Sequence, residues 1–268
     1  MNDAKGLANL RSELAGLDRS VGMIEPQGVD ESVFRYLAVC GAGLVAGVVN
    51  TLAGGGSFLT LPALIYFGLP ADVANGTNRI GVLLQNTAAA AAFHRQGHVL
   101  LAWAPILWSC VGAAFGVTAA ALIDAEILEP IFGALLILGL PLLFVRVADA
   151  RGQRRPALEA FGLLGAGFYG GFIQAGVGVI LLLILVGVRG IPVQNANPIK
   201  VLLVAIFTVP AVLVFTLQDK MDWLAGGILA AGTMVGAVLG AYLKVPPVAV
   251  KLLVAALVLI AGLDMLLN

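Results

Sequence analysis

The chain has 268 residues, of which 60% are hydrophobic and 11% are charged, and its formal net charge at pH 7 is zero. A soluble domain usually carries about 25% charged residues, so this composition excludes a protein that covers its whole surface with polar groups and favours one that lies in lipid. A neutral chain also has no basic surface for nucleic acid, and we expect no nucleic-acid partner.

The first 32 residues predict an amphipathic helix. Leu7, Leu10, Leu14, Leu17 and Val21 recur at alternating spacings of three and four, and charged residues fall between them. The segment lacks the apolar core of a signal peptide. We expect it to lie on the membrane surface or, alternatively, to pack against a copy of itself, which would make the protein a homodimer.

Apolar stretches long enough for membrane helices occupy most of the remaining chain. A helix needs about 20 apolar residues to cross the bilayer. The stretches are Val99–Ile123, Ile127–Val147, Val201–Leu217, Leu224–Leu243, Val248–Leu267 and a span that contains Ile80–Phe93. They predict an all-α, multi-pass protein of the cell membrane. No segment of domain size remains outside the membrane, and no Ser/His or HExxH pattern indicates catalytic residues, so we expect no enzyme.

Two further apolar stretches are interrupted by glycine. The stretch Val33–Phe67 contains Asn50–Ser57, which includes three consecutive glycines, and the stretch Leu158–Val188 contains Gln174–Gly178. Glycine weakens a helix by about 1 kcal/mol per residue. An opened backbone survives at membrane depth only when it is buried in protein or lines a polar cavity. These breaks therefore indicate a binding site.

Matching motifs predict two homologous halves. Gly43 matches Gly165, Gly54 and Gly56 match Gly176 and Gly178, and Gly68-Leu69-Pro70 matches Gly190-Ile191-Pro192, while Trp103, Gly112 and Gly116 match Trp223, Gly232 and Gly236. We assign residues 33–147 to a first transmembrane repeat, 148–157 to a basic cytoplasmic linker and 158–268 to a second repeat. Repeats with helices broken at matching positions are typical of secondary transporters.

The orientation of the halves depends on whether each broken segment crosses the membrane or folds back. The linker arginines place the linker in the cytoplasm by the positive-inside rule. Hairpins then put Arg189, Lys244 and Lys251 on the cytoplasmic side and Lys220 outside, whereas a single crossing reverses that balance. We therefore favour hairpins and inverted repeats, each with a glycine-broken hairpin and three transmembrane helices, although parallel halves stay open.

One cation in each half is predicted near the bilayer centre. Arg79 falls opposite Lys200 after a slip of one residue, and each lies eight or nine residues into its helix, or about 12–14 Å deep. A cation at that depth usually lines a cavity, although a helix that starts later would let the side chain reach the interface. Asparagine side chains close to the two cations in the sequence could donate hydrogen bonds to an anion or join neighbouring helices. They are Asn75, Asn78, Asn195 and Asn197.

The glycine breaks complete the predicted site. A helix that begins after a break presents free backbone N–H groups and the positive end of its dipole, which together attract anions. The residues that we assign to substrate binding at the breaks are Asn50, Thr51, Gly54, Gly55, Gly56 and Ser57 in the first half and Gln174, Gly176 and Gly178 in the second. No metal ligands or cofactor motifs accompany them, so we expect neither a metal nor a cofactor.

At these residues the sequence resembles the TauE/SafE family of sulfite and sulfonate exporters. The resemblance lies in Asn50–Ser57, Gly68–Pro70 and Ala74–Arg79, with a weaker second copy from Gln174 to Lys200, and covers about Phe34 to Leu267. It implies export of sulfite, sulfoacetate or a related sulfonate by alternating access. The alternatives are an anion channel, a membrane-embedded enzyme or assembly factor, an importer of another small carboxylate or sulfonate, and a carrier of uncharged metabolites.

Overall fold

The computed structural model describes residues 31–53, 56–97, 103–145, 147, 155–242 and 247–267. The amphipathic helix expected at residues 1–32 lies outside them except for its last two residues, which already belong to the first membrane helix. The chain divides into two compact units, Met1–Arg35 and Tyr36–Asn268. The contacts given below all lie within the second unit.

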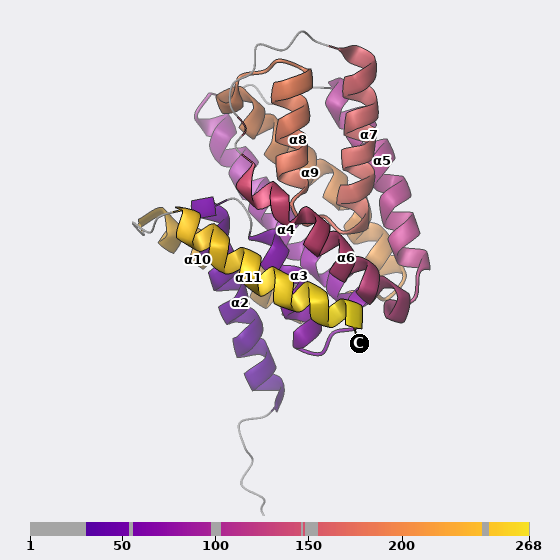
Figure 1. Ribbon diagram of the computed structural model, residues 1–268, viewed down its shortest axis with the longest axis vertical. Coiled ribbons are helices and arrows are strands. Elements are labelled where there is room, and N and C mark those ends of the chain that lie inside the picture. Colours follow the sequence, from indigo (N-terminus) through magenta and orange to yellow (C-terminus); the bar gives the residue numbers. More distant parts are fainter. Residues whose placement is uncertain are drawn as a thin grey trace, which may run out of the picture. The chain divides into compact units, whose positions relative to one another are not determined.

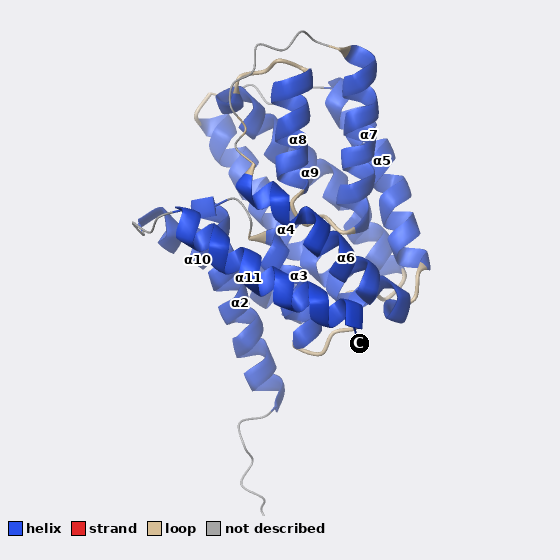
Figure 2. Ribbon diagram, viewed as in Figure 1, coloured by secondary structure: helices blue, strands red, loops and turns tan. Residues whose placement is uncertain are grey.

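Every regular element in these ranges is a helix (Figure 2). The first half contains α2 (Glu31–Ala53), α3 (Ser57–Tyr66), α4 (Ala71–Arg95), α5 (Trp103–Leu122) and α6 (Ala125–Phe144). The second contains α7 (Pro156–Phe172), α8 (Val177–Leu182), which continues into the π-helix η1 (Leu183–Val188), and then α9 (Val193–Leu217), α10 (Trp223–Tyr242) and α11 (Pro247–Leu267) (Figure 1). The element order of one half therefore repeats in the other.

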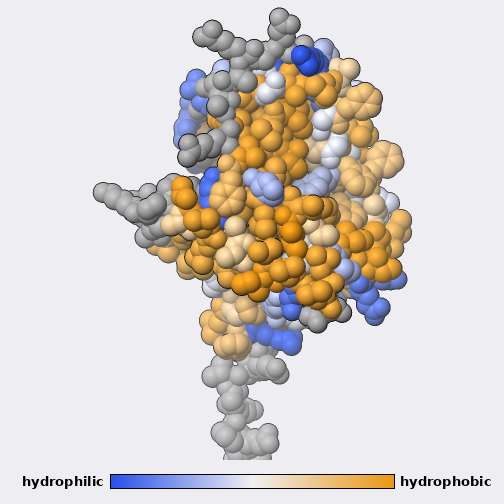
Figure 3. Space-filling view, viewed as in Figure 1, coloured by the Kyte–Doolittle hydropathy of each residue, from blue (hydrophilic) through white to orange (hydrophobic). Residues whose placement is uncertain are grey.

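Six of the described helices are long and apolar enough to cross a membrane, namely α2, α5, α6, α9, α10 and α11. Their large hydrophobic side chains point outward, as at Phe115, Leu138 and Leu213. Figure 3 shows hydrophobic residues over the face in view, with hydrophilic residues at its upper and lower margins. These features confirm the prediction of a helical, multi-pass membrane protein. The long helix α4 is less apolar because it carries the polar residues of the site.

The second broken segment folds back as a hairpin. The backbone N–H of Arg155, just before α7, donates to the carbonyl of Val188 at the end of η1. Arg189 also forms an ion pair with Glu159 of α7. The start of α7 therefore lies beside the end of η1, and the two helices run alongside each other in opposite directions (Figure 1).

The first broken segment also folds back at its glycine break. A Cβ placed on Gly56, which precedes α3, would lie 2.1 Å from the carbonyl oxygen of Ala46 in α2. The chain thus returns against the last turns of α2 immediately after the break. Only glycine permits so close an approach of two backbones.

Helices pack across the two halves through glycines. A Cβ on Gly112 or Gly116 of α5 would lie 2.0 or 2.1 Å from a carbonyl oxygen of α7, and a Cβ on Gly232 or Gly236 of α10 would lie 2.4 or 2.0 Å from one of α2. Close backbone contact of this kind is how membrane helices gain van der Waals packing. Each half therefore contributes its first helix to the other half, so that α7 packs on α5 and α2 packs on α10.

These contacts correct the predicted alignment of the first helices. Gly43 packs on Leu229 and Thr233 of α10, and Gly167 packs on Ser109 of α5, whereas a Cβ on Gly165 would meet no neighbouring atom within 4 Å. Gly43 thus corresponds to Gly167 and not to Gly165. The sequence match failed here because glycines recur at several spacings in both helices, and only the packing partner tells them apart.

Candidate functional site

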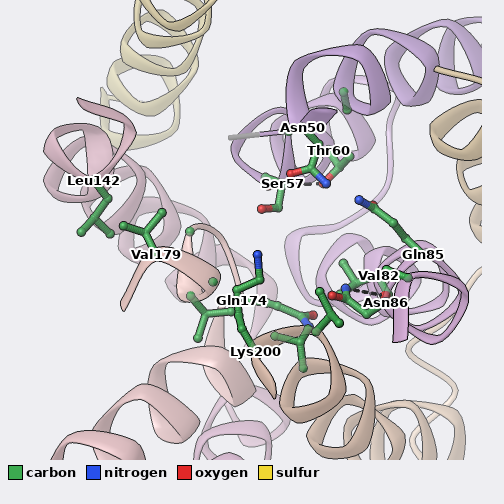
Figure 4. Close-up of a pocket in the computed structure, with 18 of the residues that line it drawn as sticks. Asn50, Ser57, Thr60, Val82, Gln85, Asn86, Leu142, Gln174, Val179 and Lys200 are labelled. Carbon is green, nitrogen blue, oxygen red and sulfur yellow. Dashed lines mark hydrogen bonds between the residues drawn. The ribbon is translucent and has the colours of Figure 1, made fainter. Parts of the chain in front are cut away.

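A cavity of about 430 Å³ lies where the two breaks meet the long helices α4 and α9. Its polar lining residues are Asn50, Ser57, Thr60, Asn78, Gln85, Asn86, Gln174, Lys200, Thr233 and Lys251. They come from both halves of the chain, and Figure 4 shows several of them facing a common space. The two breaks also touch directly, because the buried ring of Phe58 in α3 packs against Gly176.

The charged residues of this lining are both lysines, Lys200 and Lys251, and the part of the lining that the structure describes includes no carboxylate. The other polar groups are amides and hydroxyls, which can donate hydrogen bonds without adding negative charge. A cation at membrane depth is costly and usually marks a substrate path. The electrostatics of the cavity therefore favour an anion.

Lys200 extends from α9 into this space. Its Nζ donates to Asn197 Oδ1 at 3.2 Å, and its stem passes beside Gly178, where a Cβ would lie 3.4 Å from Lys200 Cδ. In Figure 4 its amine lies in the space between the two breaks, below Ser57 and Asn50 in this view. An ammonium group has three donors. It therefore retains donors for a bound anion after the contact with Asn197.

The break in the first half supplies hydroxyl groups at the start of α3. Gly56 is the N-cap of this helix, and Ser57 and Thr60 line the cavity behind it. Thr60 donates its own hydroxyl to the carbonyl of Ser57 at 3.3 Å. The helix has no acidic residue in its first turn, so the positive end of its dipole is left uncompensated by charge.

The break in the second half depends on two residues with left-handed backbone conformation. Gln174 has φ of 67° and Gly176 has φ of 73°. A glutamine rarely adopts this conformation, and it is held by its side chain, whose Nε2 donates to Thr208 Oγ1 at 2.8 Å. The helix α8 that follows is only six residues long before η1 begins. The chain here delivers Gln174, Gly176 and Gly178 to the cavity wall.

Arg79 lies elsewhere. Its side chain is fully buried and is not part of the cavity lining, although the preceding residue, Asn78, is. The guanidinium donates to carbonyl oxygens of Gly170, Gly171 and Phe172 at the end of α7. Arg79 therefore lies against the C-terminal end of α7, behind Gln174 as seen from the cavity.

The positions at which α4 and α9 begin explain why Arg79 and Lys200 do not both line the cavity. Pro70 and Pro192 are the N-caps of α4 and α9, with nearly the same φ of −53° and −55°. Counted from these caps, Arg79 is the ninth residue of α4 and Lys200 the eighth of α9. Lys200 thus corresponds to Asn78, and one residue turns a side chain by about 100° around a helix. Asn78 and Lys200 face the cavity, whereas Arg79 faces α7.

The predicted site residues divide into three groups. Asn50, Gly56, Ser57, Asn78, Gln174, Gly176, Gly178 and Lys200 line the cavity. Asn75, Arg79, Asn195 and Asn197 do not appear in its lining; Asn75 is buried beside Arg79, Asn195 is exposed, and Asn197 contacts Lys200. Gly54, Gly55 and the side chain of Thr51 lie outside the described residues.

Sequence reasoning left Thr60, Gln85, Asn86, Thr233 and Lys251 out of the site. Gln85 and Asn86 follow Asn78 at helical spacings of seven and eight, which is a signal that could have placed them on the same face. Lys251 is the fifth residue of α11 and resembles an ordinary cation near a helix end. Nothing in its neighbourhood distinguishes it, so only the fold brings it to the cavity.

The chain is similar to known membrane proteins. A family model described as sulfite exporter TauE/SafE matches residues 39–265. A probable membrane transporter protein of Haemophilus influenzae is 31% identical over 206 residues, which cover 74% of this chain and 81% of that protein. The probable membrane transporter protein YfcA of Escherichia coli K12 is 30% identical over 207 residues, which cover 75% and 77%. No solved structure matches the chain significantly.

Proposed function

We propose that this chain, which belongs to the sulfite exporter TauE/SafE family, is a secondary transporter that exports a small organosulfur anion such as sulfite, sulfoacetate or a related sulfonate. The observation that carries the proposal is the cavity whose described charged residues are Lys200 and Lys251. The family supports a membrane transporter, and the lining supports an anionic substrate.

The lining fits the chemistry of a sulfonate. Its three oxygens accept hydrogen bonds in several directions and share one negative charge. Lys200, the hydroxyl of Ser57 and the amide of Gln85 are donors that reach the cavity from α9, α3 and α4. Sulfoacetate carries a second anionic group, and Lys251 of α11 is a second cation for it. Binding by donors from separate helices couples the substrate to their relative movement.

We propose that the halves are inverted repeats and that the cavity opens toward the linker. One hairpin followed by three helices in each half gives the two halves opposite orientations. The lining reaches Val145 and Val147, which directly precede the linker, and Val193 at the start of α9. Since the linker carries Arg151, Arg154 and Arg155, the positive-inside rule assigns this side to the cytoplasm.

The opposite side is closed by polar contacts. Lys220 in the α9–α10 turn forms an ion pair with Asp72 at the start of α4. In the same region the backbone N–H of Asp222 donates to Thr77 Oγ1 at 2.9 Å. Alternating access requires these contacts to open while the linker side closes. Export is favoured by the membrane potential, since a monoanion leaving a negative-inside cell gains about 2.3 kcal/mol per 100 mV.

The test is transport of sulfite and sulfoacetate by the purified protein in liposomes, with Lys200→Gln and Lys251→Gln beside the wild type. Arg35→Gln is the matched control, because Arg35 is exposed and lies outside the cavity lining. We expect saturable flux that each lysine variant reduces at least about tenfold and that the control leaves unchanged. Flux of either anion that survives both lysine substitutions would contradict the proposed site, and conductance without saturation would indicate a channel.

A further inference from the structure

Arg79 is the largest fully buried side chain of the described residues, and no part of the proposed transport cycle yet uses it. We propose that Arg79 is a positioning residue: it neutralises the carbonyl end of α7 beside the anion cavity and fixes Gln174 in the cavity wall, without touching the anion. This inference rests on the proposed function for the identity of the anion, but its structural part does not.

The guanidinium is matched to the end of α7. Nη1 donates to Gly170 O at 2.5 Å, and Nη2 donates to Gly171 O at 2.8 Å and to Phe172 O at 3.1 Å. These three carbonyls belong to the last turn of the helix, which lacks intrahelical partners for them. Asn75 supports the arrangement from α4, since its Nδ2 donates to Phe172 O at 2.8 Å and its Oδ1 accepts from Arg79 Nη2 at 2.9 Å.

The position of this helix end makes the charge necessary. A helix presents about half a negative charge at its C-terminus, and α7 ends two residues before Gln174, which lines the cavity. An uncapped carbonyl end at that place would repel an anion. The guanidinium donates to carbonyl and amide oxygens, so its positive charge is not cancelled by a carboxylate among the described residues. Arg79 therefore turns an unfavourable helix end into a favourable one.

Arg79 also orients a side chain that reaches the cavity. Its Nη1 donates to Gln174 Oε1 at 2.7 Å, while Gln174 Nε2 donates to Thr208 Oγ1 at 2.8 Å. The carboxamide is thereby fixed at both ends, and the left-handed backbone of Gln174 is held with it. A lysine at position 79 would keep the charge but could not form the same fork of bonds.

The first measurement is hydrogen–deuterium exchange of the amides of residues 170–178 in the substrate-free protein. We compare the wild type with Arg79→Lys, and use Lys200→Gln as the control that alters a cavity cation instead. Arg79→Lys is expected to raise exchange in this segment about tenfold because the helix end loses its cap, whereas Lys200→Gln leaves it at the wild-type rate. Unchanged exchange in Arg79→Lys overturns the capping role.

The second measurement is the affinity of the same proteins for sulfoacetate, together with thermal unfolding. Arg79→Lys is expected to weaken binding about tenfold, and Lys200→Gln to abolish it. Arg79→Lys that keeps wild-type exchange but abolishes binding would show that Arg79 is itself a ligand. If wild-type protein binds no sulfoacetate, the proposed substrate fails while the exchange comparison still decides the role of Arg79.

A third variant covers the case in which Arg79→Lys does not fold. Gln174→Met preserves the bonds from Arg79 to the three carbonyls and removes only the carboxamide. We expect it to fold, and to bind sulfoacetate about fivefold more weakly because the wall residue that Arg79 orients is lost. Wild-type affinity and wild-type exchange in Gln174→Met would overturn the positioning role.

Discussion

The ammonium of Lys220 lies 3.1 Å from Asp72 Oδ2, and it also donates to the carbonyl of Ala121 at 2.9 Å. These contacts join the α9–α10 turn of the second half to the start of α4 and the end of α5 in the first. Both side chains are largely shielded from solvent. Because the three elements meet on the side away from the linker, the contact couples the two halves where the proposed transporter must open.

The first prediction concerns this contact. Asp72→Asn removes the ion pair but keeps the shape, and a pair of this kind stabilises the closed side by about 1 kcal/mol. Because a loss of about 1 kcal/mol changes an equilibrium constant about fivefold, we expect the fraction of protein that is open on that side to rise about fivefold. The measurement is labelling of Ser57→Cys by a membrane-impermeant thiol reagent from that side, in protein whose Cys40 and Cys110 are replaced by alanine.

The matched control is Asp124→Asn, which removes a carboxylate at the start of α6, on the same side as the start of α4. It should leave the labelling rate unchanged. A double variant with Asp72→Lys and Lys220→Asp should restore part of the closure. Equal labelling in wild type and Asp72→Asn would show that the ion pair does not contribute to closing this side.

The second prediction concerns the glycine contact between α10 and α2. A Cβ on Gly236 would lie 2.0 Å from the carbonyl oxygen of Leu44, whereas Gly227 of the same helix has open space around it. Gly236→Ala is therefore expected to destabilise the protein by about 1–3 kcal/mol through overpacking, and Gly227→Ala to be neutral or slightly stabilising. Thermal unfolding of both variants in detergent checks this, and equal melting temperatures would contradict the close packing.

Hydropathy was sufficient to predict the helices, because bilayer thickness and backbone hydrogen bonding leave few alternatives to a long apolar helix. It also located both breaks, since glycines interrupt apolar stretches at Gly56 and Gly176. The turn-and-proline motifs before α4 and α9 were found for a similar reason: Gly68 and Gly190 have φ of 91° and 76°, which glycine adopts at little cost.

The direction of individual side chains could not be predicted from the same patterns. Arg79 and Lys200 lie nearly the same number of residues after the starts of α4 and α9, but this count does not determine which face of a helix packs on which neighbour. Their separation follows from the common start of α4 and α9, which the assumed slip of one residue concealed. Lys251 shows the complementary limit, because it reaches the cavity only through the packing of α11 on α6.

The third prediction concerns the hairpin of the second half. Glu159 of α7 is buried and forms an ion pair with Arg189, which follows η1. Glu159→Gln leaves the arginine beside a neutral partner, and we expect a loss of about 2 kcal/mol in the free energy of unfolding. Thermal unfolding is the measurement, and exchange of the amides at residues 183–190 should rise with it. Wild-type stability in Glu159→Gln would show that the other contacts of α7 hold the hairpin.

The fourth prediction uses Gly178 to separate stability from anion binding. A Cβ there would lie 3.4 Å from Lys200 Cδ, which is ordinary contact, so Gly178→Ala should fold and bind as the wild type does. The larger side chain of Gly178→Val must push the stem of Lys200 aside. If this displacement costs about 1.4 kcal/mol, the KM for sulfoacetate transport should rise roughly tenfold.

Gly187→Val is the matched control for this substitution, because it lies in the same hairpin and has no atom within 4 Å of a Cβ. It should change the KM little. If Gly178→Val transports with the wild-type KM while folding normally, the position of the Lys200 amine does not govern anion binding. If both valine variants raise the KM equally, the effect comes from the hairpin backbone and not from Lys200.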